Sequence, residues 1–419
     1  MKPEVSPNSK ASTPSHSWRR SILWFVGGVF STILLLVIAY FGIRMAYTSG
    51  QLPERQVKTE AELAARFAAD MKQAADENRT DIEGDVRTLY ARQQHDPNAT
   101  LDFLLLSGGG DRGAFGTGVL LGWSTVASGA NALPKFDGVS GVSTGAFIAP
   151  FAFLGTHADY ETIDRLFRNP KPDWVERRGL FFFLPDNASL AEVPGLVRDL
   201  RAQVDPQFAE RIVQAASTGG RRVLLIQATD IDGGTPRAFD AVAAAREAVA
   251  TGNTELLSDI LLSSAAIPGA FPPREIQGRL YADGGIASNF FYGGPMDESD
   301  TFGATWRREH PNAPIPKTRY WVIINEYIQP IPVTVQPNWP AILYVSVRSA
   351  EAIALRHLYA LAEATKLRGD GDVEVRWVAI PQTWRPPNDQ FFDEATMRQL
   401  SDEGRRLGAD PKSWNTTAP

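Results

Sequence analysis

Two glycine-rich segments carry the residues that could do chemistry in this chain of 419 residues. The segment 141–145 reads Gly-Val-Ser-Thr-Gly and follows an apolar stretch. A strand that turns sharply into a helix at this spacing holds the serine side chain clear of the backbone. Gly141 and Gly145 are needed because a Cβ atom at either place would collide with neighbouring main chain. Ser143 is therefore a candidate nucleophile.

The second segment, 107–113, reads Ser-Gly-Gly-Gly-Asp-Arg-Gly and also follows an apolar stretch. Consecutive glycines let the backbone aim several N–H groups at one place, and such groups stabilise the oxyanion that forms during acyl transfer. The sharp turn that presents Ser143 (the nucleophile elbow) and the glycine loop that could bind an oxyanion both serve acyl transfer. The two segments together therefore predict a serine hydrolase.

The general base that would activate Ser143 is less obvious. None of the five histidines lies in a recognisable motif: His16, His95, His157, His310 and His357. His357 shares one face of a predicted helix with apolar residues, so we interpret it as a packed core histidine. Asp283 ends a short predicted strand in the segment 281–285, Tyr-Ala-Asp-Gly-Gly, whose glycines allow another loop to come close. The alternative for Asp283 is an ordinary Asp-Gly turn.

Four motifs in this order resemble the patatin-like phospholipases. They are Gly-Gly-Gly-x-Arg-Gly, Gly-x-Ser-x-Gly, a small-residue segment that ends in Ile-Pro-Gly-x-Phe-Pro-Pro at 267–273, and Asp-Gly-Gly. The resemblance extends over residues 99–415, and further stretches such as Phe-Phe-Asp at 391–393 are similar to a bacterial branch of the family.

The resemblance implies a catalytic dyad of Ser143 and Asp283 that works without histidine. The other implied site residues are Gly108, Gly109, Gly110, Arg112 and Gly113 around the oxyanion, Gly141 and Gly145 in the elbow, and Gly284 and Gly285 after the aspartate. Asp111 departs from the pattern, because its charge would oppose an oxyanion unless Arg112 or solvent neutralises it. An ordinary aspartate is a weak base for an alcohol, so we expect Asp283 to be partly shielded from water.

The implied substrate is a glycerophospholipid or another lipid ester, with a lysophospholipid equally possible, and no cofactor is implied. The alternative function is a membrane-tethered lipid-binding or scaffold protein that has the same fold and little turnover. A hydrolase needs Ser143 and Asp283 within hydrogen-bond distance, whereas a binding protein does not.

The glycine run also has a nucleotide-binding interpretation. Residues 108–113 fit the pattern Gly-x-Gly-x-x-Gly and follow a predicted strand. That fold needs an acidic residue at the end of the next strand, yet the segment after Gly118 has none before Asp137, which begins the strand leading to Ser143. No Gly-Lys-Ser/Thr follows a glycine loop, so a P-loop is not predicted either. The hydrolase interpretation is favoured.

Residues 22–43 form an apolar segment with no charge between Arg20 and Arg44. This length is sufficient to cross roughly 30 Å of hydrocarbon as a helix, and it exceeds the roughly 7–15 apolar residues of a cleaved signal. A buried core helix is the other alternative. Trp24 and Tyr40 lie near the ends, where aromatic side chains suit the membrane interface. We therefore predict a transmembrane anchor.

The charges around this segment predict its orientation. Residues 1–20 contain four basic residues and one acidic residue, and only Arg44 directly follows the span. The positive-inside rule then places 1–20 in the cytoplasm and 46–419 across the membrane. For a bacterial protein, the expected location is the inner membrane with the catalytic domain facing the periplasm.

Composition limits the other functions. The formal net charge is −6, and because residues 1–20 carry +3, the rest of the chain carries −9. An acidic exported domain argues against nucleic acid as a partner. The absence of cysteine excludes disulfides, thiolate metal sites and lipid attached at cysteine. The few scattered histidines form no metal-binding motif, and the sequence indicates no protein partner.

A helical stalk is predicted between the anchor and the catalytic domain. It begins with the capping box Thr-Glu-Ala-Glu at 59–62, and apolar residues follow at helical spacing: Leu63, Phe67, Met71 and Ala74. We interpret it as a helix packed on its own domain rather than a dimerising coil. The predicted divisions are a cytoplasmic tail (1–20), a transmembrane helix (21–45), a linker and stalk (46–98) and a catalytic domain (99–415).

Within the catalytic domain, predicted strands alternate with helices. The strands are expected at 101–106, 136–139, 222–229, 319–326 and 373–380, the last near a sheet edge, and the helices at 114–124, 144–153 and 256–266. Continuous apolar strands argue for a sheet covered on both faces. The fold class is therefore α/β, and with the resemblance it is a three-layer α/β/α sandwich with a mostly parallel sheet. Residues 181–185 and 330–340 are expected to be loops, either packed or forming a rim that admits acyl chains.

Overall fold

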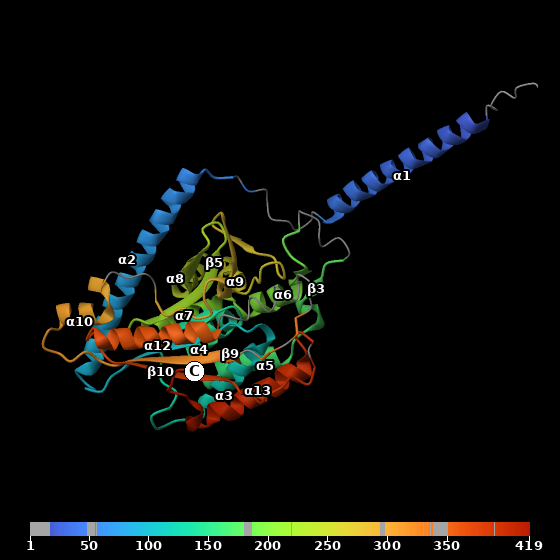
Figure 1. Cartoon of the computed structure of the whole chain (residues 1–419). Coiled ribbons are helices and arrows are strands. Elements are labelled where there is room, and N and C mark those ends of the chain that lie inside the picture. Colours follow the sequence, from blue (N-terminus) through green and yellow to red (C-terminus); the bar gives the residue numbers. More distant parts are fainter. Residues whose placement is uncertain are drawn as a thin grey trace, which may run out of the picture. The chain divides into compact units, whose positions relative to one another are not determined.

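The chain divides into two compact units, Met1–Arg55 and Gln56–Pro419, in the computed structural model shown in Figure 1. The two loops expected at 181–185 and 330–340 lie wholly or largely outside the described residues. The structure describes residues 17–47, 55, 57–179, 187–218, 220–293, 298–329, 331–332, 334–335, 337, 351–388 and 390–419.

The first unit contains one long helix, α1 (Ser17–Tyr47). Its segment Leu23–Gly42 has a mean hydropathy of 2.2 over 20 residues, and all its side chains are exposed. By length and composition this helix could cross a membrane.

A mixed, mostly parallel sheet forms the centre of the second unit. Its strand order is β10-β9-β1-β2-β5-β8-β7, with β6 also paired to β5. The first five strands of that order are parallel, and β6, β7 and β8 pair antiparallel. The strand at 373–380 lies at the edge, as predicted. The bounds are β1 Leu101–Leu106, β2 Gly138–Val142, β5 Val223–Asp230, β6 Thr235–Asp240, β7 Arg274–Ile276, β8 Arg279–Asp283, β9 Thr318–Tyr327 and β10 Val373–Ile380; β3 (Glu176–Arg177) and β4 (Ala191–Glu192) pair separately.

Helices connect these strands, and the three predicted within the catalytic domain, at 114–124, 144–153 and 256–266, are confirmed to within two residues at each end. Their bounds are α2 Glu60–Gln93, α3 Gly113–Trp123, α4 Thr144–Leu154, α5 His157–Arg168, α6 Pro194–Gln203, α7 Pro206–Ser217, α8 Ala241–Thr251, α9 Glu255–Ser264, α10 Phe302–Glu309, α12 Glu351–Leu367 and α13 Glu394–Ala409, with short 3-10 helices η1 Gly110–Arg112, η2 Pro172–Trp174, η3 Gly284–Ile286, η4 Glu298–Asp300 and η5 Pro411–Ser413.

Both faces of the sheet are buried, which makes the domain the expected three-layer sandwich. Successive side chains of a strand point to opposite faces. In β1, Leu104 and Leu106 join the large core that also contains residues of α3, α4 and α13. Leu105 points the other way and joins a second core with Leu355 and Leu358 of α12. The continuous apolar pattern of β1 thus reflects helices on both sides (Figure 1).

Helix α2 begins with the predicted capping box: Thr59 Oγ1 accepts from the N–H of Glu62, and the Glu62 carboxylate accepts from the N–H of Thr59. Its second half is packed, because Val86 and Leu89 are buried in a core. The helix therefore packs on its own domain as predicted, but not through the apolar row read from the sequence. The first three residues of that row are between 38% and 47% exposed: Leu63, Phe67 and Met71.

The first half of α2 is held instead by charge. Asp70 accepts two hydrogen bonds from the guanidinium of Arg279 on β8, at 2.5 and 2.7 Å. Arg66 pairs with Asp230 on β5 at 3.8 Å. Polar side chains can fix a helix while its apolar row stays exposed, and hydrophobic periodicity does not reveal this.

The core interpretation of His357 is also wrong. His357 lies on the exposed side of α12, and Ile353 is exposed with it. The buried positions of this helix are Ala354, Leu355, Leu358 and Ala362. The helix exists as predicted, but its apolar stripe is rotated relative to the one read from the sequence.

Candidate active site

The pairing of strand β5 brings Ser143 and Asp283 together. Residues 225–230 of β5 pair with β6 along one edge. The opposite edge is shared: β2 pairs with it as far as Val142 opposite Gln227, and β8 pairs from Ala228 opposite Asp283. Since β2 and β8 run in opposite directions, their ends meet on this edge. Residues 140 positions apart in sequence are thus placed side by side.

Ser143 lies at the sharp turn between β2 and α4. Its backbone has φ 54° and ψ −121°, a conformation that costs free energy for a residue with a side chain. A Cβ on Gly141 would lie 2.3 Å from the Gly145 oxygen, and a Cβ on Gly145 would lie 2.4 Å from the Leu106 oxygen. Both positions therefore require glycine, as the sequence predicts.

The Ser143 hydroxyl donates a hydrogen bond to Asp283 Oδ2 at 2.7 Å. Asp283 Oδ1 accepts from the Gly285 N–H at 2.8 Å. Only 2% of Asp283 is exposed, and this burial raises its pKa to about 6 despite the two hydrogen bonds. The carboxylate is shielded as expected, so it is a stronger base than an ordinary aspartate.

Neighbouring polar groups fix the backbone around this pair. The Ser143 N–H donates to Ser264 Oγ at 2.8 Å, and Ser264 Oγ donates to the Gln227 carbonyl at 2.5 Å. Thr229 Oγ1 donates to the Asp283 carbonyl at 2.9 Å. The central strand β5 thereby holds both residues of the pair.

Histidine has no part in this arrangement among the described residues. His310 stacks on Tyr90 with ring centroids 3.6 Å apart. His157, on α5, has its Nδ1 2.7 Å from the Oγ of Ser124, the residue that follows α3. Neither lines the cavity that Ser143 faces. His16 lies outside the described residues.

The glycine loop lies against Ser143. A Cβ on Gly108 would lie 3.2 Å from the Ser143 Cβ, so Gly108 lies directly beside Ser143. Gly109 has φ 146°, and a Cβ there would lie 2.3 Å from the carbonyl oxygen of Asn325. Buried Asn325, on β9, donates from Nδ2 to the Ser107 carbonyl at 2.8 Å and from its N–H to Ser107 Oγ at 2.8 Å. The end of β9 therefore fixes the start of this loop.

The two charged residues of the glycine loop, Asp111 and Arg112, interact with neighbouring segments of the chain. Arg112 forms a salt bridge with Glu326, the residue after Asn325, and its guanidinium lies 5.5 Å from the ring centroid of Tyr327. Burial raises the pKa of Asp111, whose Oδ2 accepts from the N–H of Phe392 at 3.1 Å. Both side chains thus connect the loop to neighbouring segments.

Comparison with known proteins identifies the domain that contains this site. The model of the family described as patatin-like phospholipase matches residues 104–294, which include Ser143 and Asp283. This domain belongs to the patatin-like phospholipase family. No curated protein matches the chain.

Two solved structures are similar to the chain that carries this patatin-like domain. VipD from Legionella pneumophila has 11% identity and a TM-score of 0.30, over 76% of this chain and 68% of that one. The type III effector protein ExoU has 14% identity and a TM-score of 0.27, over 74% of this chain and 53% of that one.

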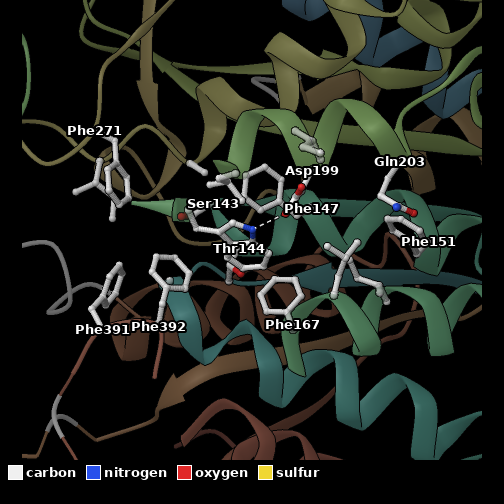
Figure 2. Close-up of a pocket in the computed structure, with 18 residues that line it drawn as sticks. Ser143, Thr144, Phe147, Phe151, Phe167, Asp199, Gln203, Phe271, Phe391 and Phe392 are labelled. Atoms are coloured by element: carbon white, nitrogen blue, oxygen red, sulfur yellow. Dashed lines mark hydrogen bonds between the residues drawn. The ribbon is translucent and has the colours of Figure 1, made fainter. Parts of the chain in front are cut away.

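An apolar cavity opens beside Ser143 in the patatin-like domain. Figure 2 shows Ser143 with Phe271, Phe391 and Phe392 on one side, and Phe151 and Gln203 at the opposite end. The empty space between its walls is about 720 Å³ when the open solvent at its mouth and the narrow gaps between lining atoms are included, and the part wide enough for water is about 60 Å³. Its other lining residues come from α4, α5, η2, α6 and nearby loops: Gly110, Thr144, Phe147, Ile163, Leu166, Phe167, Trp174, Leu196, Asp199, Leu200, Ala265 and Ile267.

Several residues of this site were not predicted from the sequence. Gln227, Ser264 and Asn325 hold the backbone of the site, and Asp199 and Trp174 form part of the cavity wall. A usable signal was present for Asn325, because a polar residue ends a long apolar strand at the edge where α/β sheets bind ligands. In the described part of the chain, no group of three or more histidine or acidic side chains could hold a metal ion.

Proposed function

We propose that this protein is a membrane-anchored serine hydrolase of lipid esters that uses Ser143 and Asp283 as a dyad. The observation that carries the proposal is the 2.7 Å hydrogen bond from the Ser143 hydroxyl to a buried carboxylate whose pKa is about 6. A general base is most effective when its pKa lies near the working pH. The apolar cavity at the same serine supports a lipid rather than a polar ester.

The proposed reaction has two steps. Asp283 accepts the Ser143 proton while Oγ attacks the ester carbonyl carbon, and the tetrahedral intermediate then expels the alcohol, which takes the proton from Asp283. Water next attacks the acyl-serine, with Asp283 again accepting a proton. Fatty acid leaves, and Ser143 recovers its hydrogen.

The glycine loop would stabilise the oxyanion of both steps. We assign this role to the backbone N–H groups of Gly108, Gly109 and Gly110, because Gly108 lies beside Ser143 and Gly110 lines the cavity next to it. Gly113 lies close to Thr144 at the start of α4, since a Cβ on Gly113 would be 2.1 Å from Thr144 Oγ1. Arg112 is paired with Glu326, so we propose that it braces the loop.

Active-site labelling combined with a product assay tests this function. The full-length protein should react with a fluorophosphonate probe and release fatty acid from phospholipid or lysophospholipid, and Ser143→Ala should do neither. Ser124→Ala is the matched control, because it removes a serine that is paired with a histidine outside the cavity. Wild-type protein that binds lipid but neither labels nor releases fatty acid would support the alternative, a tethered lipid-binding protein.

The anchor is proposed from α1 and the charges around it. Leu23–Gly42 is long and apolar enough to span, and the basic residues before it favour a cytoplasmic N-terminus with the catalytic domain exported, into the periplasm in a bacterium. The cysteine-free chain permits a direct test. Single cysteines introduced at Lys10 and Arg55 should label from opposite sides of the membrane. Labelling of both from the cytoplasmic side would refute the topology.

A further inference from the structure

Helix α4 provides one wall of the cavity from Ser143 inward. Phe147 and Phe151 are four residues apart, so they lie along one face of α4, and Ser143 comes directly before its first turn. From Thr144, the first residue of the helix, to Phe151 the axis runs about 10 Å. Figure 2 shows the same direction, since Phe151 lies at the far end of the cavity from Phe391 and Phe392. Phe151 is buried and packs on Phe208, with ring centroids 5.0 Å apart.

The opposite walls are apolar along the same length. Ile163 and Phe167 come from α5, and Leu200 comes from α6; all three are buried and line the cavity. An apolar space that has Ser143 at one end and aromatic and aliphatic walls suits a hydrocarbon chain. A headgroup, which needs polar partners, does not suit it.

Among the described residues that line the wall, the one carboxylate is hydrogen-bonded by other protein groups. Asp199 Oδ2 accepts from the indole N–H of Trp174 at 2.8 Å, and Oδ1 accepts from Lys171 and from Arg198, each at 2.9 Å. These bonds hold the Trp174 ring in the wall, where its edge contacts Phe392 at a centroid distance of 5.7 Å. Asp199 therefore fixes an aromatic surface instead of offering a charge to the ligand.

We infer that this cavity binds the scissile acyl chain and that Phe151 and Leu200 determine the chain length accepted. The inference rests on the proposed function for the position of the ester carbonyl at Ser143. Each methylene group of the chain buried before Phe151 should raise kcat/KM about fourfold. Groups beyond Phe151 add nothing or reduce the rate.

The test compares p-nitrophenyl esters from acetyl to palmitoyl with the full-length protein. Phe151→Ala should move the optimum to longer chains and raise kcat/KM for palmitoyl relative to acetyl by roughly tenfold, because truncation lengthens the cavity. Leu200→Phe should lower that ratio by a similar factor. The acetyl ester is too short to reach Phe151 at the far end of the cavity and serves as the internal standard.

Phe153→Leu is the matched control. Phe153 lies on α4 but faces away from the cavity, 4.2 Å from the Arg222 guanidinium, and it is fully buried. Phe153→Leu should lower the stability of the core without changing the acyl-chain length that gives the highest kcat/KM. If neither Phe151→Ala nor Leu200→Phe changes the palmitoyl-to-acetyl ratio, the chain-length assignment is wrong, although the protein is still a hydrolase.

A binding measurement separates this inference from the proposed function. A fatty acid with a diazirine at its methyl end, photolysed with the membrane-embedded Ser143→Ala protein, should crosslink to α4 near Phe151 and to α6 near Leu200. That result would support the acyl site even if the wild type released no fatty acid. Crosslinks confined to α1 or to exposed residues would overturn it.

Discussion

Two buried aspartates contribute to this site, and their pKa values are shifted in opposite directions. Asp283, at the end of β8, accepts a hydrogen bond from the cavity-lining Ser143, and Asp199, on α6, lines the cavity wall. Burial raises the pKa of Asp283 to about 6, against hydrogen bonds from Ser143 and Gly285. Burial acts in the same direction at Asp199, but hydrogen bonds from Arg198, Trp174 and Lys171 outweigh it and lower that pKa to about 2. Neighbouring cations make the difference.

This comparison shows what separates a base from a structural carboxylate. Asp283 has two hydrogen-bond donors, both neutral, so it can accept a proton near neutral pH. Asp199 accepts from a lysine and an arginine and remains ionised, which suits it to hold Trp174 in place. Burial alone therefore does not identify a catalytic carboxylate.

The largest expected effect comes from neutralising each aspartate in turn. Asp283→Asn should lower kcat/KM on the order of 10⁴-fold or more, because the serine loses its base. Asp199→Asn should cost less than about tenfold, since only the order of the cavity wall changes. Steady-state hydrolysis of a lipid ester measures both. If both variants lost a comparable factor in kcat/KM, the distinction between Asp283 as a catalytic base and Asp199 as a structural carboxylate would be wrong.

A smaller effect is expected at a third acidic residue, Glu326, which like Asp199 is paired with a cation. Arg112→Ala and Glu326→Gln should each lower kcat roughly tenfold with little change in KM, because either change releases the glycine loop from β9. If Arg112 instead stabilises the oxyanion by its charge, Arg112→Ala should cost about 10²-fold. Glu326→Gln would then be neutral or activating.

The smallest expected effect is on stability, and its sign differs between the two aspartates. A raised pKa in the folded state means that ionisation of Asp283 destabilises the protein as the pH rises through about 6. Asp283→Asn should therefore raise the melting temperature by roughly 2–6 °C at about pH 8 and by little near pH 4. Asp199, with its lowered pKa, stabilises the fold at all pH values above about 4, so Asp199→Asn should lower the melting temperature there.

These melting curves should be measured on the full-length protein in one detergent across the pH series. Asp283→Asn that melts below the wild type at about pH 8 would contradict the assignment of a raised pKa.

The sequence was informative where a residue type has one physical use. The glycines around Ser143 are required by close main-chain contacts, and continuous apolar strands require two covered faces, so the elbow and the layer order could be predicted. The nearness of Asp283 depends on how β2 and β8 share an edge of β5, which no local pattern encodes. The pairing of Ser143 with Asp283 could be predicted only because the order of the motifs resembles that of a known family.

Other features were misread because they depend on long-range packing. The apolar row of α2 is exposed, and ion pairs of Arg66 and Asp70 connect this part of the helix to β5 and β8. The resemblance places Arg112 around the oxyanion, and no local pattern indicates its partner Glu326, which is 214 residues away in sequence. Ion pairs form between side chains that are distant in sequence, and the hydrophobic periodicity of a segment does not predict them.

The pH dependence of the rate of fluorophosphonate labelling tests the central claim most directly, because it reports the ionisation of the base without a lipid substrate. With Asp283 as base, the rate should rise about tenfold per pH unit up to about pH 6 and then level off, and Asp283→Asn should label slowly at every pH. His157→Gln should keep the wild-type profile. A rate that is flat between about pH 4.5 and 8, or a profile that disappears in a histidine variant, would contradict the Ser143–Asp283 dyad.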